Sequence, residues 1–179
     1  MGDTYMEGLI HIYTGTGKGK TTAAVGLAVR FAGSGGKVLF AQFLKNDKSS
    51  ELYALRQITN IEFLPSCNYF GFTHSMTPLI KEKAQKHYTD YFGKIINKTL
   101  SGNYGLLILD EIIAADNNGL VPHGKLTDFL KNKPAYLEIV LTGRSPSQDL
   151  LDTADYISDI HKVKHPFDKN IPARMGIEK

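Results

Sequence analysis

The stretch TGTGKGKTT at residues 14–22 constrains this chain most, because it joins an apolar run to a helical pattern. Gly15, Gly17 and Gly19 allow backbone conformations closed to other residues, so successive N–H groups can point inward at phosphate oxygens. The N-terminus of the following helix adds partial positive charge. We therefore expect a phosphate-binding loop. The alternative is a glycine-rich turn that only joins a strand to a helix.

Two side chains in this loop carry specific expectations. Lys20 is placed to neutralise the outer phosphates of a nucleotide, and the hydroxyl of Thr21 is placed to ligate Mg²⁺. The strict pattern GxxxxGK[ST] has glycine where this chain has Thr14, so the loop is a variant of it. The residues expected to bind the nucleotide here are Gly15, Thr16, Gly17, Lys18, Gly19, Lys20, Thr21 and Thr22.

Short runs rich in Val, Ile, Leu and Phe alternate with helical stretches along the chain, which predicts an α/β fold with a mostly parallel sheet and helices on both faces. One helix is expected over residues 21–31, and a longer one is expected to begin with Thr77 as N-cap and Pro78 in its first turn. The predicted strands are residues 9–13, 38–43, 61–64, 106–109, 137–141 and 156–163.

The longer helix carries apolar side chains at spacings of three to five residues, which predicts that they pack into the core. These are Ile80, Ala84, Tyr88, Tyr91, Ile95 and Leu100.

Polar residues follow two of the predicted strands. The run LLILDE places Asp110 and Glu111 at the carboxyl edge of the sheet, where open α/β folds bind ligands, and one of them could complete the shell of Mg²⁺, directly or through water. Arg144 ends the run LEIVLTGR at the same edge and could reach phosphate. The alternative for these three side chains is an ordinary solvated surface.

Composition limits the possible classes. With 179 residues, 42% hydrophobic and 22% charged, the chain is expected to form a single globular domain over residues 1–179, neither disordered nor membrane-spanning. The acidic, polar N-terminus is unlike a signal peptide, so we expect the cytoplasm. A net charge of +3 is weak evidence for nucleic acid, which we do not expect as a partner. Cys67 is expected to be a free thiol.

The motifs YTGTGKGKTTAAVGLAVR, QFLK, GFTH, LLILDE, VLTGR and VKHPFDKNIPARMGI occur in order over residues 9–177, nearly the whole chain. In this the sequence resembles the P-loop type of ATP:corrinoid adenosyltransferase, in which Thr14 is also the usual residue. The resemblance implies a P-loop NTPase-like (RecA-like) fold, ATP as co-substrate with Mg²⁺ or Mn²⁺, and a reduced corrinoid as substrate. In that family the 5′-deoxyadenosyl group moves to Co(I) and triphosphate leaves.

The resemblance also implies roles for single residues. Lys20 and Thr21 would act on the triphosphate, where charge grows as C5′ departs. Arg30 matches an arginine in the family's corresponding helix, which implies a catalytic contribution, with a buried salt bridge as the alternative. Phe72 matches an aromatic residue that displaces the lower axial ligand of cobalt. His74 stands where well-known relatives have tryptophan, and it either fills that volume or ligates cobalt.

Relatives of this family are commonly homodimers and receive electrons from a reducing flavoprotein such as a flavodoxin, so both are implied here. Three other functions share parts of the pattern. A small-molecule kinase would use the same loop but release ADP. A RecA-like ATPase would need a basic, aromatic surface for nucleic acid. A carrier of ATP or corrinoid would bind without turnover.

Overall fold

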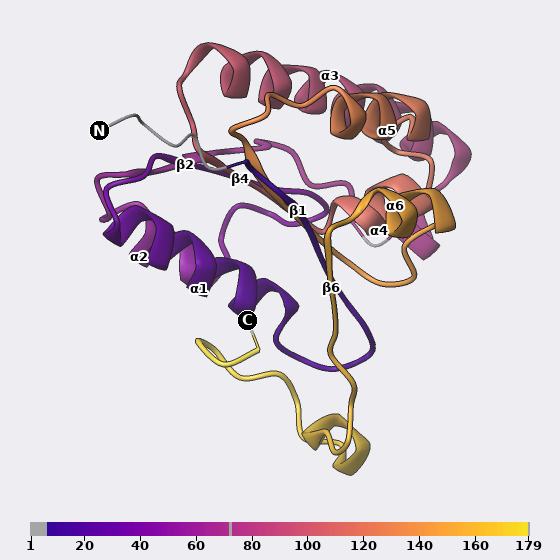
Figure 1. The fold of residues 1–179 in the computed structure, drawn as a ribbon. Coiled ribbons are helices and arrows are strands. Elements are labelled where there is room, and N and C mark those ends of the chain that lie inside the picture. The colour runs from indigo at the N-terminus through magenta and orange to yellow at the C-terminus, as the bar shows by residue number, and fades with distance from the viewer. Residues whose placement is uncertain (1–6, 72, 179) are drawn as a thin grey trace, which may run out of the picture.

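The computed structural model describes residues 7–71 and 73–178. Its centre is a six-stranded sheet in which every paired strand runs parallel to its neighbours, in the order β3-β2-β4-β5-β1-β6 (Figure 1). The strands are β1 (Ile10–Thr14), β2 (Val38–Gln42), β3 (Ile61–Leu64), β4 (Leu106–Asp110), β5 (Glu138–Thr142) and β6 (Tyr156–Asp159).

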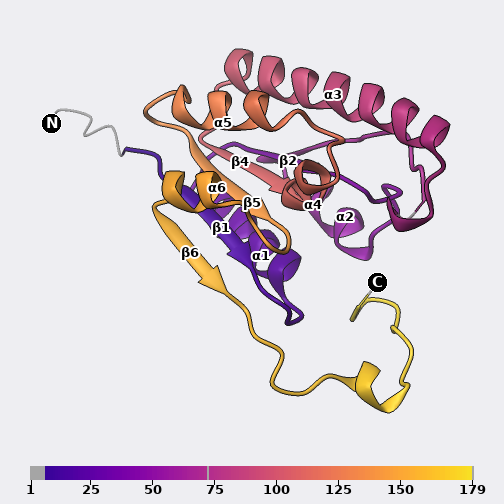
Figure 2. The ribbon, with the colours of Figure 1, turned by 90° about the vertical axis from the view of Figure 1, so that its right-hand side faces the viewer.

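Helices cover both faces of this sheet (Figures 1 and 2). Apolar side chains of α1 (Lys20–Gly33) and α2 (Ser50–Leu55) pack on one face. The other face carries α3 (Pro78–Ser101), α4 (Ile112–Asn117), α5 (His123–Lys131) and α6 (Gln148–Thr153). Two short 3₁₀ segments complete the elements, η1 (Thr73–Ser75) and η2 (Pro166–Lys169). The predicted parallel α/β fold is thus confirmed.

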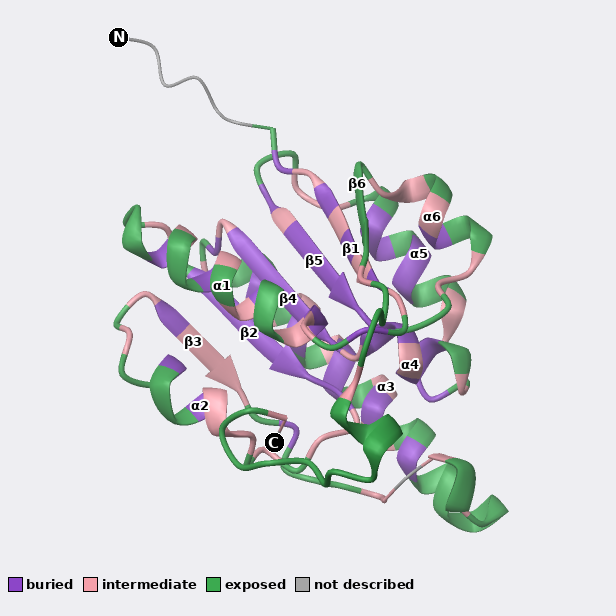
Figure 3. Cartoon of the chain, turned by 90° about the horizontal axis from the view of Figure 1, so that it is seen from below, coloured by how far each residue is buried: buried purple, intermediate pink, exposed green. Residues whose placement is uncertain are grey.

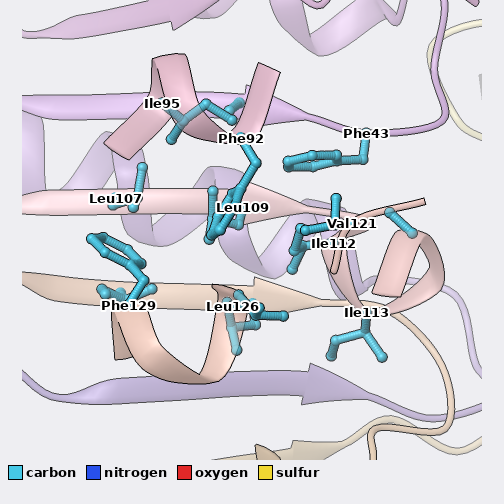
Figure 4. Close-up of a cluster of buried hydrophobic side chains, with 14 of the residues drawn as sticks. Phe43, Phe92, Ile95, Leu107, Leu109, Ile112, Ile113, Val121, Leu126 and Phe129 are labelled. Carbon is cyan, nitrogen blue, oxygen red and sulfur yellow. The ribbon is translucent and has the colours of Figure 1, made fainter. Parts of the chain in front are cut away.

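The central strands β2 and β4 are buried on both faces and are apolar up to their last residues, Gln42 and Asp110. Every residue of β2 and β4 is buried, whereas the edge strand β6 and most of the segment after it are exposed (Figure 3). On the α3 face, Leu107 and Leu109 pack beneath Phe92, Leu126 and Phe129 (Figure 4). This rigid sheet fixes the positions of the loops at its carboxyl edge.

The helix expected from Thr77 begins as predicted, since the Thr77 hydroxyl accepts a hydrogen bond from the Ile80 backbone N–H at 3.3 Å. Four of the six predicted core positions are buried, but the predictions for Ile80 and Leu100 are wrong: they are 36% and 51% exposed. A 24-residue helix is about 36 Å long, whereas a five-residue strand spans about 17 Å. The two ends of α3 therefore extend past the sheet that its middle covers.

The last strand is shorter than the predicted 156–163 and ends at Asp159. Beyond it, the Ile160 N–H donates to the Thr14 carbonyl at 3.0 Å, and the Ile160 carbonyl accepts from the Gly17 N–H at 2.6 Å. The chain therefore leaves the sheet to pack along the phosphate loop. Among the helices of residues 7–71 and 73–178, none has the length and apolarity to span a bilayer.

Candidate active site

A pocket of about 690 Å³ lies beside the phosphate loop at the carboxyl edge of the sheet. Open parallel sheets bind their ligands at this edge, because the loops after several strands converge there. The walls are residues 16–22 and Val25, Lys45 and residues 49–51, Glu111, Arg144, and the tail residues 165–167, 171–173 and 176–178. Loops after β1, β2, β4 and β5 thus share one space with the C-terminal tail.

The glycines of the phosphate loop are needed for its path. Gly15 has φ +103° and Gly19 has φ +123°, values that L side chains rarely adopt. At Gly17, an added Cβ would lie 2.7 Å from the Ile160 carbonyl oxygen. Gly19 also forms the N-cap of α1, with no side chain to cap the helix. The first turn therefore points free N–H groups toward the pocket, as an anion site requires.

The ammonium of Lys20 is folded back against the phosphate loop. Its Nζ donates to the Gly15 carbonyl at 2.9 Å and to the Gly17 carbonyl at 2.8 Å, and the residue is only 7% exposed. Burial lowers the pKa of Lys20, and the nearby charge of Arg144 lowers it further. A phosphate group placed over the loop would supply the counter-charge that this lysine lacks.

Asp110 ends β4 at the floor of the site and is fully buried. Its Oδ1 accepts from the hydroxyls of Thr21 at 2.9 Å and Thr142 at 2.7 Å. Its Oδ2 accepts from Lys45 Nζ at 2.7 Å and Gln42 Nε2 at 3.2 Å. Four donors from four segments therefore hold one carboxylate in place, which satisfies its buried oxygens.

Glu111, the next residue, lines the pocket itself. It adopts the left-handed conformation, φ +60°, as the N-cap of α4, and its N–H donates to the Thr142 hydroxyl at 2.9 Å. This turn carries the carboxylate away from the path of β4. Burial raises the pKa of Glu111, and the negative charge of Asp110 adds to the rise.

The donor set at this point fits Mg²⁺ or Mn²⁺. The Thr21 hydroxyl and the carboxylates of Asp110 and Glu111 are oxygen ligands, which hard cations prefer. Within the described ranges 7–71 and 73–178, no three His, Cys, Asp or Glu side chains gather as a metal site. Phosphate oxygens would therefore have to complete the shell, which is the usual way in which Mg²⁺ is held.

The arginines differ in position. Arg144 follows β5 and lines the pocket, as its place at the strand end predicted. Arg30 is exposed near the end of α1 and is not among the pocket-lining residues. Arg30 lies ten positions after Lys20 on the helix, which is about 15 Å along the axis. The structure therefore brings Lys20, Thr21 and Arg144 together, and leaves Arg30 apart from them.

The expected corrinoid-side residues belong to the loop between β3 and α3. Phe72 lies outside the described residues. His74 is exposed in η1 and does not line the pocket. The preceding part of the loop is anchored on α3: Ser66 Oγ and Asn68 Nδ2 lie 3.0 and 3.2 Å from the two ring nitrogens of His87. The base of this loop is thus held by the core helix.

Sequence reasoning assigned no role to several pocket residues. Lys45 and Glu51 reach the site from the loop after β2 and from α2, and the tail supplies one wall through His165, Phe167 and Ile177 among others. The stretches QFLK and VKHPFDKNIPARMGI are among the motifs that carry the family resemblance. Nothing in their spacing showed that they meet the phosphate loop, since that contact joins segments far apart in the chain.

Comparison with known proteins gives consistent results. Residues 6–178 match the family described as ATP:corrinoid adenosyltransferase BtuR/CobO/CobP. Corrinoid adenosyltransferase CobA of Salmonella typhimurium is 32% identical over 172 residues, which cover 96% of this chain and 86% of that protein. Corrinoid adenosyltransferase of Escherichia coli K12 is 30% identical over 172 residues, with the same shares, 96% and 86%.

Among solved structures, the KaiC-like protein PH0186 of Pyrococcus horikoshii OT3 aligns with a TM-score of 0.50 and 15% identity, over 87% of this chain and 73% of that chain. At that identity the likeness concerns the fold alone, which is P-loop NTPase-like. The expected fold class is therefore confirmed by a comparison of shapes as well as by the strand order.

Proposed function

The chain belongs to the ATP:corrinoid adenosyltransferase family, and on that basis we propose that the pocket beside the phosphate loop holds ATP while its 5′-deoxyadenosyl group is transferred to a reduced corrinoid. The lone pair of Co(I) forms a bond to C5′, the bond from C5′ to oxygen breaks, and triphosphate leaves with that bonding pair. The observation that carries this proposal is the convergence of Lys20, Thr21, Glu111 and Arg144 on one pocket, with Asp110 bonded to Thr21 behind it.

The site's chemistry suits this reaction, because the nucleophile comes with the substrate and no protein base is needed. The protein's task is to place ATP and to stabilise the charge that grows on the triphosphate. Lys20, Arg144 and the N–H groups of the phosphate loop would do this. Thr21, Asp110 and Glu111 would hold Mg²⁺ or Mn²⁺, which supplies further positive charge to the leaving group when bound.

The first test is an anaerobic reaction of the wild-type protein with chemically reduced cob(I)alamin, ATP and Mg²⁺. We expect the Co(I) absorbance to disappear as adenosylcobalamin forms, and inorganic triphosphate to be the phosphate product. Release of ADP without a cobalt–carbon product would point to a kinase instead. Hydrolysis stimulated by nucleic acid would indicate a RecA-like ATPase, and binding without turnover would indicate a carrier.

We propose further that the loop between β3 and α3 removes the lower axial ligand of cob(II)alamin, with Phe72 as the displacing side chain and His74 filling volume rather than ligating cobalt. Support comes from how the loop is anchored. Phe70 packs on His87 and Tyr88, with ring centroids 5.4 and 5.9 Å away.

Electron paramagnetic resonance tests this role of the loop. Cob(II)alamin with the protein and ATP is expected to give a four-coordinate signal, which Phe72→Ala should weaken. A spectrum of the wild-type complex that stays five-coordinate would contradict the displacement, and nitrogen hyperfine structure that disappears in His74→Ala would show ligation by His74.

Four remaining parts of the proposal rest on the family resemblance and on the sequence. The protein would act in the cytoplasm, as a single domain over residues 1–179 and as a homodimer, with a flavodoxin-like reductant. The net charge of +3 and the sequence pI of about 8.8 favour an acidic electron donor over a basic one.

A further inference from the structure

Lys45, the last residue of the stretch QFLK at residues 42–45, lines the active-site pocket. Lys45 Nζ lies 2.7 Å from Asp110 Oδ2 and 3.6 Å from Glu51 Oε1. It also lies 3.4 Å from the hydroxyl oxygen of Thr21, the residue that follows Lys20 in the phosphate loop. Lys45 is thus a cation at the Thr21 end of the loop, and its side chain is 25% exposed.

Three lysines line the pocket, Lys18, Lys20 and Lys45, and the last two occupy different ends of it. Lys20 Nζ faces the carbonyls of Gly15 and Gly17, whereas Lys45 Nζ faces Thr21 and the carboxylates behind it. Both residues line the pocket, and Arg144 lines it from the loop after β5. An extended polyanion such as a triphosphate is bound best by cations spread along its length, and Lys45 adds one at the Thr21 end of the loop.

Asp110 binds Lys45 but also accepts hydrogen bonds from three other side chains. An ion pair of 2.7 Å with Asp110 and the carboxylate of Glu51 at 3.6 Å hold the Lys45 ammonium at the wall of the pocket. If the ammonium leaves, Asp110 keeps its bonds to Thr21, Thr142 and Gln42. The carboxylate would lose its counter-ion but keep three hydrogen bonds, which lower the cost of leaving it buried without the ammonium.

We propose that Lys45 is a triphosphate-binding residue whose ammonium moves from Asp110 into the pocket to contact the leaving group of ATP. This inference rests on the proposed function, since it takes the triphosphate as the group that leaves. Lys45, Lys20 and Arg144 then place three cations around a product whose charge increases as C5′ departs. Asp110 and Glu51 serve as its counter-ions when no phosphate is within reach.

The test is the binding of inorganic triphosphate by calorimetry, without corrinoid. Lys45→Met is expected to weaken this binding about tenfold or more, the size typical of a lost charged contact. Lys45→Arg keeps the charge and should retain most of the affinity. Lys48→Met is the matched control, because Lys48 is exposed in the same loop and does not line the pocket, and it should change the affinity less than about twofold.

A second variant separates direct contact from support through Asp110. Lys45→Gln can still donate a hydrogen bond to Asp110 but carries no charge, so it should bind triphosphate as poorly as Lys45→Met. Wild-type affinity in Lys45→Gln, or in a folded Lys45→Met, would overturn the proposal. Lys45→Gln also decides the question if Lys45→Met does not fold.

Failure of the proposed function would look different. A wild-type protein that binds triphosphate but forms no adenosylcobalamin from cob(I)alamin would contradict adenosyl transfer and leave the Lys45 contact intact. Conversely, normal transfer by Lys45→Gln with undiminished triphosphate affinity would contradict only the inference about Lys45.

Discussion

Replacing Lys20 with methionine is expected to lower kcat/KM for ATP about a hundredfold or more. This is the usual effect of removing one preorganised group that stabilises the charge of a transition state. Methionine has a similar length and keeps the buried stem packed, so the change removes mainly the ammonium. That ammonium lies on the carbonyls of Gly15 and Gly17, inside the loop over which phosphate would sit. The measurement is the rate of adenosylcobalamin formation at several ATP concentrations, with pre-reduced corrinoid.

The split between kcat and KM gives further information. If Lys20 stabilises the departing triphosphate more than bound ATP, kcat should fall together with kcat/KM, whereas a role in binding alone would raise KM and leave kcat unchanged. Lys83→Met, a change at an exposed position of α3, is the control and should behave like the wild type. Retention of kcat/KM in Lys20→Met within about threefold would exclude Lys20 from the reaction.

The parts of this site that the sequence could predict are local ones. The phosphate loop is a continuous stretch whose glycines, lysine and threonine have fixed spacing between a strand and a helix. Asp110 and Glu111 follow the apolar run LLIL, whose length predicts a buried strand. Parallel strands bring their carboxyl ends to one edge of the sheet. The fold class therefore predicts that Thr21 and Asp110 lie close together, and the structure has a hydrogen bond between them.

The parts that the sequence could not predict depend on contacts between distant segments. The end of β6 is set by the packing of Ile160 against Gly17, and alternation of residue types along 156–163 carries no trace of that contact. The limits of the buried stripe on α3 depend on the length of the sheet below it. The position of Lys45 depends on a buried carboxylate 65 residues away.

The fold also explains why one wall of the pocket escaped prediction. The tail after β6 is mostly exposed and contains little regular structure, so it shows no periodic pattern. It extends from the edge of the sheet and turns back toward the body (Figure 2), where residues 165–178 contribute to the pocket. The motif VKHPFDKNIPARMGI in this segment carries part of the family resemblance, but a motif does not show where in the fold the segment lies.

Gly15→Ala is expected to reduce the affinity for ATP about tenfold or more and to lower the free energy of unfolding by about 1–3 kcal/mol. At φ +103° an alanine is strained, and its Cβ would lie 2.3 Å from Asp159 Oδ1 and 2.5 Å from the Ile160 carbonyl oxygen. The Asp159 side chain can rotate away, but the backbone of Ile160 cannot. Relief would require the loop and the segment after β6 to separate, which would break the bond from the Gly17 N–H to the Ile160 carbonyl.

Gly26→Ala is the matched control, because Gly26 lies inside α1 and an added Cβ there would meet no atom within 4 Å. Alanine favours a helix over glycine by up to about 1 kcal/mol, so this variant should unfold at a higher denaturant concentration and bind ATP unchanged. Urea unfolding and ATP titration of both variants make the comparison. If Gly15→Ala bound ATP as tightly as Gly26→Ala, the conformation of Gly15 would not be required for the nucleotide site, because the phosphate loop would then tolerate separation from the segment after β6.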